Sequence, residues 1–254
     1  MRKITIATHC WAKKLPQYAV FLRAQLSSLV LHHPRYTEVS HITICEASDT
    51  DTINVLSDFA QYDTPIQLSA IVLKPQQVWR RAIGRNLVAE RDVDSDLIWY
   101  TDCDYLFGDG CIDMLFEKWE ERDRPEMLWP KWFLVNETKE PIDQFWKDSV
   151  GHRGMIMPDI SNFILQKCPR AIGGVQIVRG DWLRERGFLP NTKWQDAPDE
   201  PFPDCRDDVA FREWLRKVGG RYRWTEPLTG LYRMRHTEVG YGVGLYRERK
   251  NVVG

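Results

Sequence analysis

Two aspartates separated by one residue, Asp102-Cys103-Asp104, directly follow an apolar run at residues 97–101. The run is rich in residues that favour strands, so the two carboxylates are predicted to stand where a buried strand ends. Carboxylates at i and i+2 can reach one hard cation, and Mn²⁺ or Mg²⁺ held in this way keeps positions open for substrate phosphates. Because ligands of open α/β sheets bind at the carboxyl ends of strands, the pattern predicts a metal-bridged diphosphate. The alternative is a solvated turn, in which aspartate is also common.

The composition is that of an ordinary globular protein and restricts the classes of partner. The chain has 254 residues, of which 43% are hydrophobic and 28% charged, and its formal net charge is -1. Nucleic-acid binding generally requires a basic surplus, so nucleic acid is not an expected partner. No apolar run approaches the roughly 20 residues that span a bilayer, and no secretory signal precedes the first expected strand. We therefore expect a cytoplasmic protein, with peripheral contact at the inner membrane face left open.

The cysteines and tryptophans suggest a buried core rather than a cross-linked one. Six cysteines, at positions 10, 45, 103, 111, 168 and 205, form no Cys-x-x-Cys pair. Several lie in apolar or strand-like segments, which indicates reduced, mostly buried thiols rather than a disulfide framework or a zinc site. The chain also has 11 tryptophans. Some are expected in the core and others against the apolar face of a ligand.

Apolar strands alternate with amphipathic helices through the first ~120 residues, a pattern that predicts a parallel sheet covered by helices. Strands are predicted at residues 3–8, 41–45, 66–73, 96–101, 174–178, 221–225 and 231–235, and helices at residues 16–31, 51–59, 76–91, 110–122, 181–186 and 207–218. Residues 126–135 are apolar and rich in tryptophan, whereas residues 136–170 predict a long loop or short elements of the kind that often binds ligands. No repeat or linker interrupts the chain. We predict a single α/β domain over residues 1–254, a three-layer sandwich around a mostly parallel sheet.

The order and spacing of these motifs resemble the GT-A fold of glycosyltransferases, and within it the large family 2 group. The resemblance covers most of the chain and includes Gly84-Arg85-Asn86, Asp102-Cys103-Asp104, Gly173-Gly174-Val175-Gln176-Ile177-Val178-Arg179 and Asp207-Asp208. It implies transfer of a sugar from a nucleotide-diphosphate sugar, a UDP- or GDP-sugar, to a hydroxyl of a glycan or other acceptor. It also implies a nucleotide-sugar donor half at residues 1–105 and an acceptor half at residues 106–254.

In this family the Asp-x-Asp motif binds a divalent metal, Mn²⁺ or Mg²⁺, on the donor diphosphate. The resemblance makes Asp104 the direct ligand and assigns Asp102 to the nucleotide ribose or, through water, to the metal. A cation there stabilises the charge that the nucleoside diphosphate gains as it leaves. The family often adds a third ligand from the C-terminal region, frequently a histidine, which implies His236; a surface histidine is the alternative.

The resemblance places the nucleotide pocket at the ends of the first two strands. Thr8 and His9 end the first strand, and Glu46 or Asp49 follows the second, where the family often has an acid near the base. The turn Glu46-Ala47-Ser48-Asp49 departs from the usual Asp-rich turn, so the base stays undefined.

Two arginines of the helix before the metal strand are further candidates. Arg81 and Arg85 are one turn apart and share a helix face. Arg85 falls at the family's arginine–asparagine position, which implies that it holds the pyrophosphate or organises its loop. The alternative for both is a solvated helix face, near Glu90 and Asp92.

Asp207-Asp208 resembles the acidic pair that supplies the catalytic base in inverting members. The base deprotonates the acceptor hydroxyl as it attacks the anomeric carbon, and a helix N-terminus favours the ionised carboxylate. The second acid is usually the base in this family, so Asp208 is preferred and Asp207 remains a candidate. The alternative is a stabilising role in the first helical turn.

Gly173-Gly174 has no side chains, so its backbone can approach a sugar closely. In the family this segment lies between donor and acceptor; a plain turn before a strand is the alternative. Trp182 and Trp194 are candidate platforms for sugar rings or, equally, residues of the core.

Three other functions remain open from the sequence. A sugar-phosphate nucleotidyltransferase also combines an α/β sheet with acidic metal ligands, but the loop His9-Cys10-Trp11-Ala12-Lys13-Lys14 lacks its expected glycines. A retaining glycosyltransferase needs no such base. A non-catalytic protein that binds a nucleotide or glycan could use the same scaffold, because fold does not fix activity.

Overall fold

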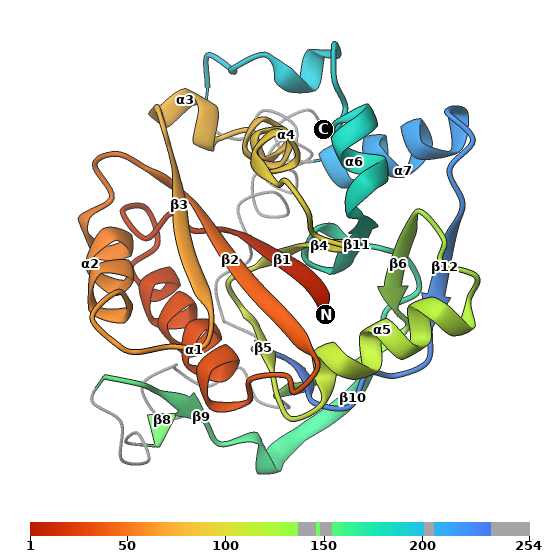
Figure 1. Ribbon diagram of the computed structural model, residues 1–254. Coiled ribbons are helices and arrows are strands. Elements are labelled where there is room, and N and C mark those ends of the chain that lie inside the picture. Colours follow the sequence, from red (N-terminus) through yellow and green to blue (C-terminus); the bar gives the residue numbers. More distant parts are fainter. Residues whose placement is uncertain (137–145, 148–153, 201–205, 235–254) are drawn as a thin grey trace, which may run out of the picture.

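The computed structural model describes residues 1–136, 146–147, 154–200 and 206–234 and has the predicted α/β architecture. Seven strands form the central sheet (Figure 1), in the spatial order β12 (Tyr222–Thr225), β6 (Met127–Pro130), β11 (Gln176–Arg179), β4 (Leu97–Asp102), β1 (Arg2–His9), β2 (Thr37–Glu46) and β3 (Gln67–Leu73). Strands β4, β1, β2 and β3 are parallel, as are β6 and β12, while β11 is antiparallel to both of its neighbours. The mostly parallel sheet is therefore confirmed.

Helices cover both faces of this sheet. Helix α1 (Gln17–Leu31) packs against α2 (Thr50–Phe59), and α4 (Arg81–Arg91), preceded by the short α3 (Pro75–Val78), packs against α6 (Gly180–Arg186). Figure 1 shows α4, α6 and α7 (Asp207–Lys217) towards the top of the view, α1 and α2 towards the left, and α5 (Cys111–Glu121) at the lower right. The strands run between the first three of these helices and the other three, which gives the three-layer arrangement.

A second, four-stranded sheet lies beyond the end of β4. Its spatial order is β10 (Phe163–Lys167), β7 (Trp132–Asn136), β13 (Leu231–Arg233) and β5 (Tyr105–Phe107). Because β5 begins directly after the Asp-x-Asp motif and pairs with β13, this sheet brings a late segment of the chain to that motif. The remaining short elements are β8 (Trp146–Lys147), β9 (Met157–Pro158) and the 3₁₀ turns η2 (Ile160–Asn162), η3 (Gly173–Val175) and η4 (Lys193–Gln195).

The prediction of a single helix at residues 76–91 is wrong, because the segment forms two helices, α3 and α4, separated by Trp79 and Arg80. Arg80 occupies the N-cap position of α4 and has extended backbone angles, φ -118° and ψ 97°. Gly84 does not interrupt the helix. A Cβ at Gly84 would lie 2.6 Å from the Ile44 side chain and 2.7 Å from His9 Nε2, so glycine allows α4 to pack directly on β1 and β2.

Two further boundaries differ from the prediction. Helix α2 is capped by Asp49, whose Oδ1 accepts from the Thr52 backbone N–H at 3.1 Å, so Asp51 lies in the first turn and is not the cap. Gly173–Val175 form a 3₁₀ turn, so β11 begins only at Gln176.

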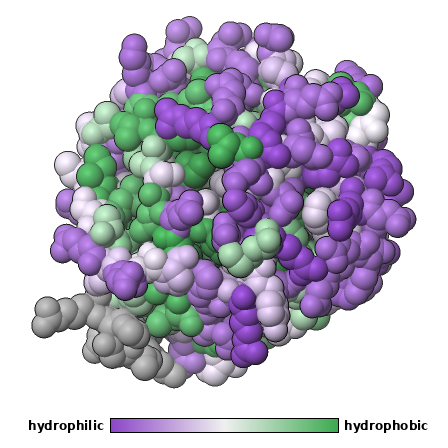
Figure 2. Space-filling model, in the orientation of Figure 1, coloured by the Kyte–Doolittle hydropathy of each residue, from purple (hydrophilic) through white to green (hydrophobic). Residues whose placement is uncertain are grey.

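The core runs through the whole described structure and contains the cysteines. Cys10, Cys45, Cys103, Cys111 and Cys168 are buried and free, as predicted, and Cys205 lies outside the described residues. Hydrophilic side chains dominate the right half of the face in Figure 2, over α5, α7 and β12, whereas hydrophobic residues are visible towards β3, where Val72 is 54% exposed. In the described ranges, no helix is long and apolar enough to cross a membrane.

Candidate functional site

Four segments far apart in the sequence meet at the carboxyl end of β4. His9, at the end of β1, lies in register with Asp102. Arg81, at the start of α4, donates from Nη1 to Asp102 Oδ1 at 3.2 Å and from Nη2 to Asp207 Oδ1 at 3.1 Å. Asp207 is the first residue of α7. The sheet edge where the sequence predicts a ligand thus carries a cluster of paired charges.

Arg85 is fully buried and connects three parts of this cluster. Its Nη1 donates to Gln176 Oε1 at 3.1 Å and to Asp207 Oδ2 at 3.4 Å, and its Nη2 donates to the Gly173 carbonyl at 2.7 Å. Burial lowers the pKa of Arg85, and the Asp207 carboxylate opposes that shift. Arg85 is therefore an internal anchor and not part of a solvated helix face.

The two glycines of η3 let the chain pack directly on the charged cluster. A Cβ at Gly174 would lie 2.4 Å from Tyr105 Cε2 and 3.0 Å from Asp102 Oδ2, and a Cβ at Gly173 would lie 2.7 Å from Arg81 Nη1. The backbone thus approaches the protein's own side chains closely. The approach to a sugar stays a prediction.

Gly174→Ala is expected to lower the free energy of unfolding by about 1–3 kcal/mol, the usual cost of overpacking a filled site. The Tyr105 ring that the new methyl would meet is fully buried and has little room to move. Gly173→Ala is the matched control, because its methyl meets only the end of the flexible Arg81 side chain. Urea denaturation of both variants measures the difference; equal stabilities would contradict the proposed contact.

Asp104 is held by a residue that the sequence analysis did not identify. Arg233, at the end of β13, donates from Nε to Asp104 Oδ2 at 2.9 Å. The Asp104 carboxylate raises the pKa of Arg233, so this arginine stays charged. Only the position of Arg233 in a predicted late strand, three residues before His236, could have drawn attention to it.

Gln25 is a second residue that the sequence analysis missed. It lies fully buried on α1 and donates from Nε2 to the carbonyls of Asp102 (3.0 Å) and Tyr105 (2.9 Å). Its Oε1 accepts from Thr8 Oγ1 at 2.7 Å and lies 3.2 Å from Nε2 of the buried His41. Gln25 therefore fixes the loop that carries the two aspartates, and Thr8 is engaged in that support.

His9 packs against α4 at Gly84, near the charges of Arg81 and Arg85. Burial lowers the pKa of His9 well below its usual value, and the charges of Arg85 and Arg81 add to this shift, so the ring is neutral. Its Nε2 is buried and has no hydrogen-bond partner within the described ranges. The contact with a nucleotide that the resemblance implies for His9 stays a prediction.

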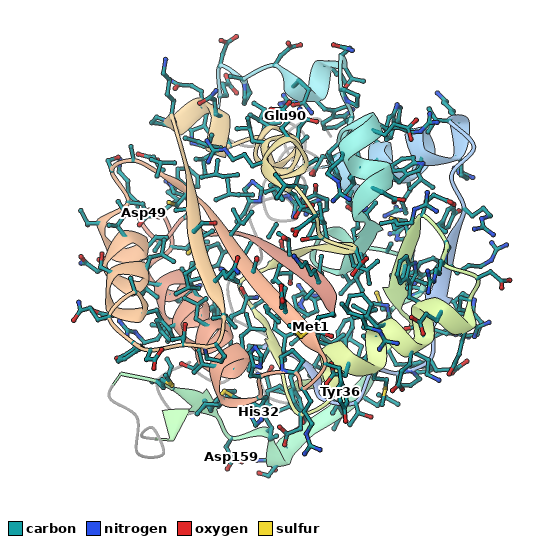
Figure 3. All side chains as sticks on the ribbon, viewed as in Figure 1. Met1, His32, Tyr36, Asp49, Glu90 and Asp159 are labelled. Atoms are coloured by element: carbon teal, nitrogen blue, oxygen red, sulfur yellow. The ribbon has the colours of Figure 1, made fainter. Side chains whose placement is uncertain are left out.

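The two acids proposed near the nucleotide base have different surroundings. Asp49 is buried beside the first turn of α2 (Figure 3), where its Oδ2 also accepts from Thr52 Oγ1 at 2.8 Å. Glu46 accepts from Trp11 Nε1 at 2.9 Å and from Lys13 Nζ at 2.7 Å. Burial opposes ionisation of Glu46, but hydrogen bonds from Lys13, Ser48 and Trp11 lower its pKa overall. Asp49 thus has a structural function, and Glu46 is the acid nearer to aromatic and basic side chains.

Asp208 differs from Asp207 in both exposure and partners. The Asp208 side chain is 15% exposed and its Oδ2 lies 3.3 Å from Arg212 Nη1, one helical turn away. The Asp207 side chain is 4% exposed and pairs with both Arg81 and Arg85. Asp208 is therefore the more accessible of the two carboxylates.

The remaining candidates lie in the core or outside the described residues. Trp182 and Trp194 are 5% and 8% exposed, and Trp182 packs edge-on against Phe211, so both are core residues in this structure. His236 lies outside the described residues. A separate polar groove of about 580 Å³, lined by Asn86, Glu90 and residues 190–193, 195 and 196, contains none of the predicted site residues; Figure 3 labels Glu90.

The carboxylate oxygens at the end of β4 suit a hard divalent cation, provided that Asp104 is available to it. Asp102 and Asp104 supply carboxylate oxygens, the ligands that Mn²⁺ and Mg²⁺ prefer. The Asp102 side chain is 34% exposed, but Asp104 is shared with Arg233. In the part of the chain that the structure describes, no three His, Cys, Asp or Glu side chains form a metal cluster. The pair fits a metal if Arg233 shares or releases Asp104.

Comparison with solved structures identifies the fold. The chain matches TarS 1-349 from S. aureus with a TM-score of 0.57 and 12% identity over 91% of this chain and 60% of that one. A TarS structure in complex with UDP-GlcNAc matches equally well, over 93% of this chain. The mannosyltransferase PcManGT from Pyrobaculum calidifontis, in complex with GDP-Man and Mn²⁺, matches with a TM-score of 0.55 and 15% identity over 98% of this chain and 61% of that one.

These matches concern the fold, and the chain spans about three fifths of the length of the three structures. No protein-family model and no curated protein matches the sequence. The seven-stranded sheet with its antiparallel β11, the helices on both faces and the structural neighbours agree with the fold that the motifs predicted. The chain therefore has a GT-A-like glycosyltransferase fold.

Proposed function

We propose that the chain is a glycosyltransferase of glycan or polysaccharide biosynthesis. It transfers a sugar from a UDP- or GDP-sugar to an acceptor hydroxyl, with inversion and with Mn²⁺ or Mg²⁺ as cofactor. The observation that carries the proposal is the convergence of Asp102, Arg81 and Asp207 from three distant segments at the carboxyl end of β4. Structural neighbours in complex with UDP-GlcNAc, or with GDP-Man and Mn²⁺, support a nucleotide-sugar donor.

The donor binds mainly to residues 1–105 and the acceptor to residues 106–254. His9 and Glu46 lie at the ends of β1 and β2 and contact the nucleoside. Arg81 orients the diphosphate from the start of α4, while the buried Arg85 keeps η3 in place. These fixed positive charges stabilise the charge that develops on the departing diphosphate.

The two aspartates after β4 would hold the metal. When bound there, the cation supplies Lewis-acid stabilisation of the diphosphate and fixes its geometry. Gln25 supports this arrangement because its two hydrogen bonds to the Asp102 and Tyr105 carbonyls keep the loop in one conformation.

Asp208 acts as the base. Its carboxylate accepts the proton of the acceptor hydroxyl, whose oxygen attacks the anomeric carbon from the face opposite the diphosphate. The bond from that carbon to the diphosphate breaks as the new glycosidic bond forms. Asp208 lies in the first turn of α7, where the helix dipole favours a negative charge.

Titration calorimetry with UDP and with GDP, each with and without Mn²⁺, tests the proposal. The unaltered protein should bind one of the two nucleotides more tightly with the metal. Asp104→Ala should weaken this metal-dependent binding at least about tenfold, which corresponds to about 1.4 kcal/mol.

Asp94→Ala is the control for the loss of one carboxylate. Asp94 precedes β4 at its opposite end and pairs with Lys3, so its removal should leave nucleotide affinity unchanged. If neither nucleotide binds under any metal condition, the proposed donor site is wrong.

A further inference from the structure

The Asp104–Arg233 pair occupies the position where the proposed function requires a metal ligand. Arg233 Nε lies 2.9 Å from Asp104 Oδ2, and the two side chains are 31% and 6% exposed. A guanidinium and a divalent cation seek the same carboxylate oxygens, so they compete wherever both can reach them.

The position of Arg233 is set by the backbone and not only by a long side chain. Arg233 lies opposite Tyr105 in the pairing of β13 with β5, and the Met234 backbone N–H donates to the Asp104 carbonyl at 2.8 Å. The guanidinium carbon also lies 5.2 Å from the centre of the Tyr105 ring. Two independent backbone contacts therefore hold this arginine against the aspartate motif.

Arg233 can also bind a second anion through its terminal nitrogens. Within the described ranges its terminal nitrogens make no hydrogen bond, since the only one it donates is that of Nε. A guanidinium presents its terminal nitrogens as a fork that matches phosphate oxygens. The same residue can therefore hold Asp104 in the free protein and contact a diphosphate that binds beside it.

The charges at the site are already paired without a metal. Asp102 pairs with Arg81, Asp104 with Arg233, and Asp207 with Arg81 and Arg85. A divalent cation that enters alone meets carboxylates that already have an arginine partner, and it adds positive charge beside those arginines. A cation that enters with a diphosphate brings its own compensating charge.

We propose that Arg233 competes with the divalent metal for Asp104 in the free protein, so that the metal binds tightly only together with the nucleotide diphosphate. The inference rests on the proposed donor site and adds to it an order of binding. Arg233 is in this view a positioning residue that releases Asp104 when the diphosphate offers its guanidinium a new anion.

Titration of the nucleotide-free protein with Mn²⁺, followed by the electron paramagnetic resonance signal of the free ion, tests the proposal. Arg233→Gln removes the competitor and should tighten Mn²⁺ binding by about tenfold or more, the scale on which groups around metal ligands change metal affinity. Arg223→Gln is the charge-matched control. Arg223 is exposed on β12, and its Nη1 donates to the Tyr222 carbonyl, so Mn²⁺ affinity should not change.

A double variant separates competition at Asp104 from a general charge effect. In the Asp104→Asn background, Arg233→Gln should tighten Mn²⁺ binding no more than the control does. An equal effect in both backgrounds would overturn the proposal, as would unchanged Mn²⁺ affinity in the single variant. If the Gln variant does not fold, Arg233→Met gives the same test, and Mn²⁺ should raise its melting temperature more than that of the unaltered protein.

Different results would contradict the proposed competition and the proposed donor site. If the unaltered protein binds UDP or GDP with Mn²⁺ but Arg233→Gln leaves Mn²⁺ affinity unchanged, only the competition is wrong. If no nucleotide binds, the donor site itself is wrong, whatever the variant does.

Discussion

Arg85→Met is expected to lower the free energy of unfolding by about 3 kcal/mol, the lower end of the cost of breaking a buried ion pair. Arg85 has no exposed side-chain surface, and its loss leaves the Gly173 carbonyl without its 2.7 Å donor. Asp207 keeps Arg81 as a partner, which is why we expect the lower end. Urea denaturation followed by tryptophan fluorescence measures the change.

Arg81→Met is the control, because the two arginines share a helix face and the same partner, Asp207. The Arg81 side chain is 26% exposed, whereas that of Arg85 has no exposed surface, so water can replace part of what is lost with Arg81. Arg85→Met should therefore cost more stability than Arg81→Met. Equal losses in the two variants would show that burial does not set the difference.

The difference between these two arginines also shows how far the sequence could predict the structure. Their i, i+4 spacing placed them on one helix face, and the structure confirms this, since both reach Asp207. The spacing could not tell which one is buried. That depends on η3 and α7, which lie 88 to 126 residues further along the chain and approach only in the folded state.

The strands and the aspartate motif were predicted because their signals are local. An apolar run followed by two aspartates defines the end of β4, and alternation with helices defines the parallel half of the sheet. The break between α3 and α4 was missed because Gly84, the visible helix breaker, is there for packing against β1 and β2. The chain bends instead at Arg80, where the sequence carries no such signal.

The partners of the acidic residues were the least predictable part. Asp49 is predicted near the nucleotide base, and this stays a prediction; in the structure its side chain caps α2, a function that any aspartate before a helix can have. Arg233 reaches Asp104, which lies 129 residues earlier in the chain, because β13 pairs with β5. Contacts of this kind depend on the register of the second sheet, which no local pattern defines.

The same long-range contacts assign different functions to the acids of α7. Asp207 faces into the charged cluster and accepts from two arginines, so a proton on it would weaken both ion pairs. Among the residues that the structure describes, Asp208 forms an ion pair with the neighbouring Arg212 alone, and it is more exposed than Asp207. An acceptor hydroxyl can therefore reach Asp208 without disturbing the cluster that holds the donor.

Asp208→Asn is accordingly expected to lower kcat by about a hundredfold to ten-thousandfold, the range for loss of a general base. The amide keeps the size of the side chain but cannot take up the hydroxyl proton. Nucleotide affinity should stay the same, because Asp208 contributes no ion pair to the donor cluster. The measurement is transfer from a UDP- or GDP-sugar at saturating donor, combined with calorimetry of the nucleotide.

Asp207→Asn gives the contrasting pattern, because it removes the negative charge that Arg81 and the buried Arg85 share. We expect it to lower stability and nucleotide affinity together, as a loss of the site's framework would. If Asp208→Asn retained full activity while Asp207→Asn lost transfer without loss of stability, the two assignments would have to be exchanged. If both variants transferred sugar normally, the reaction would need no base from α7, and inversion through this acidic pair would be excluded.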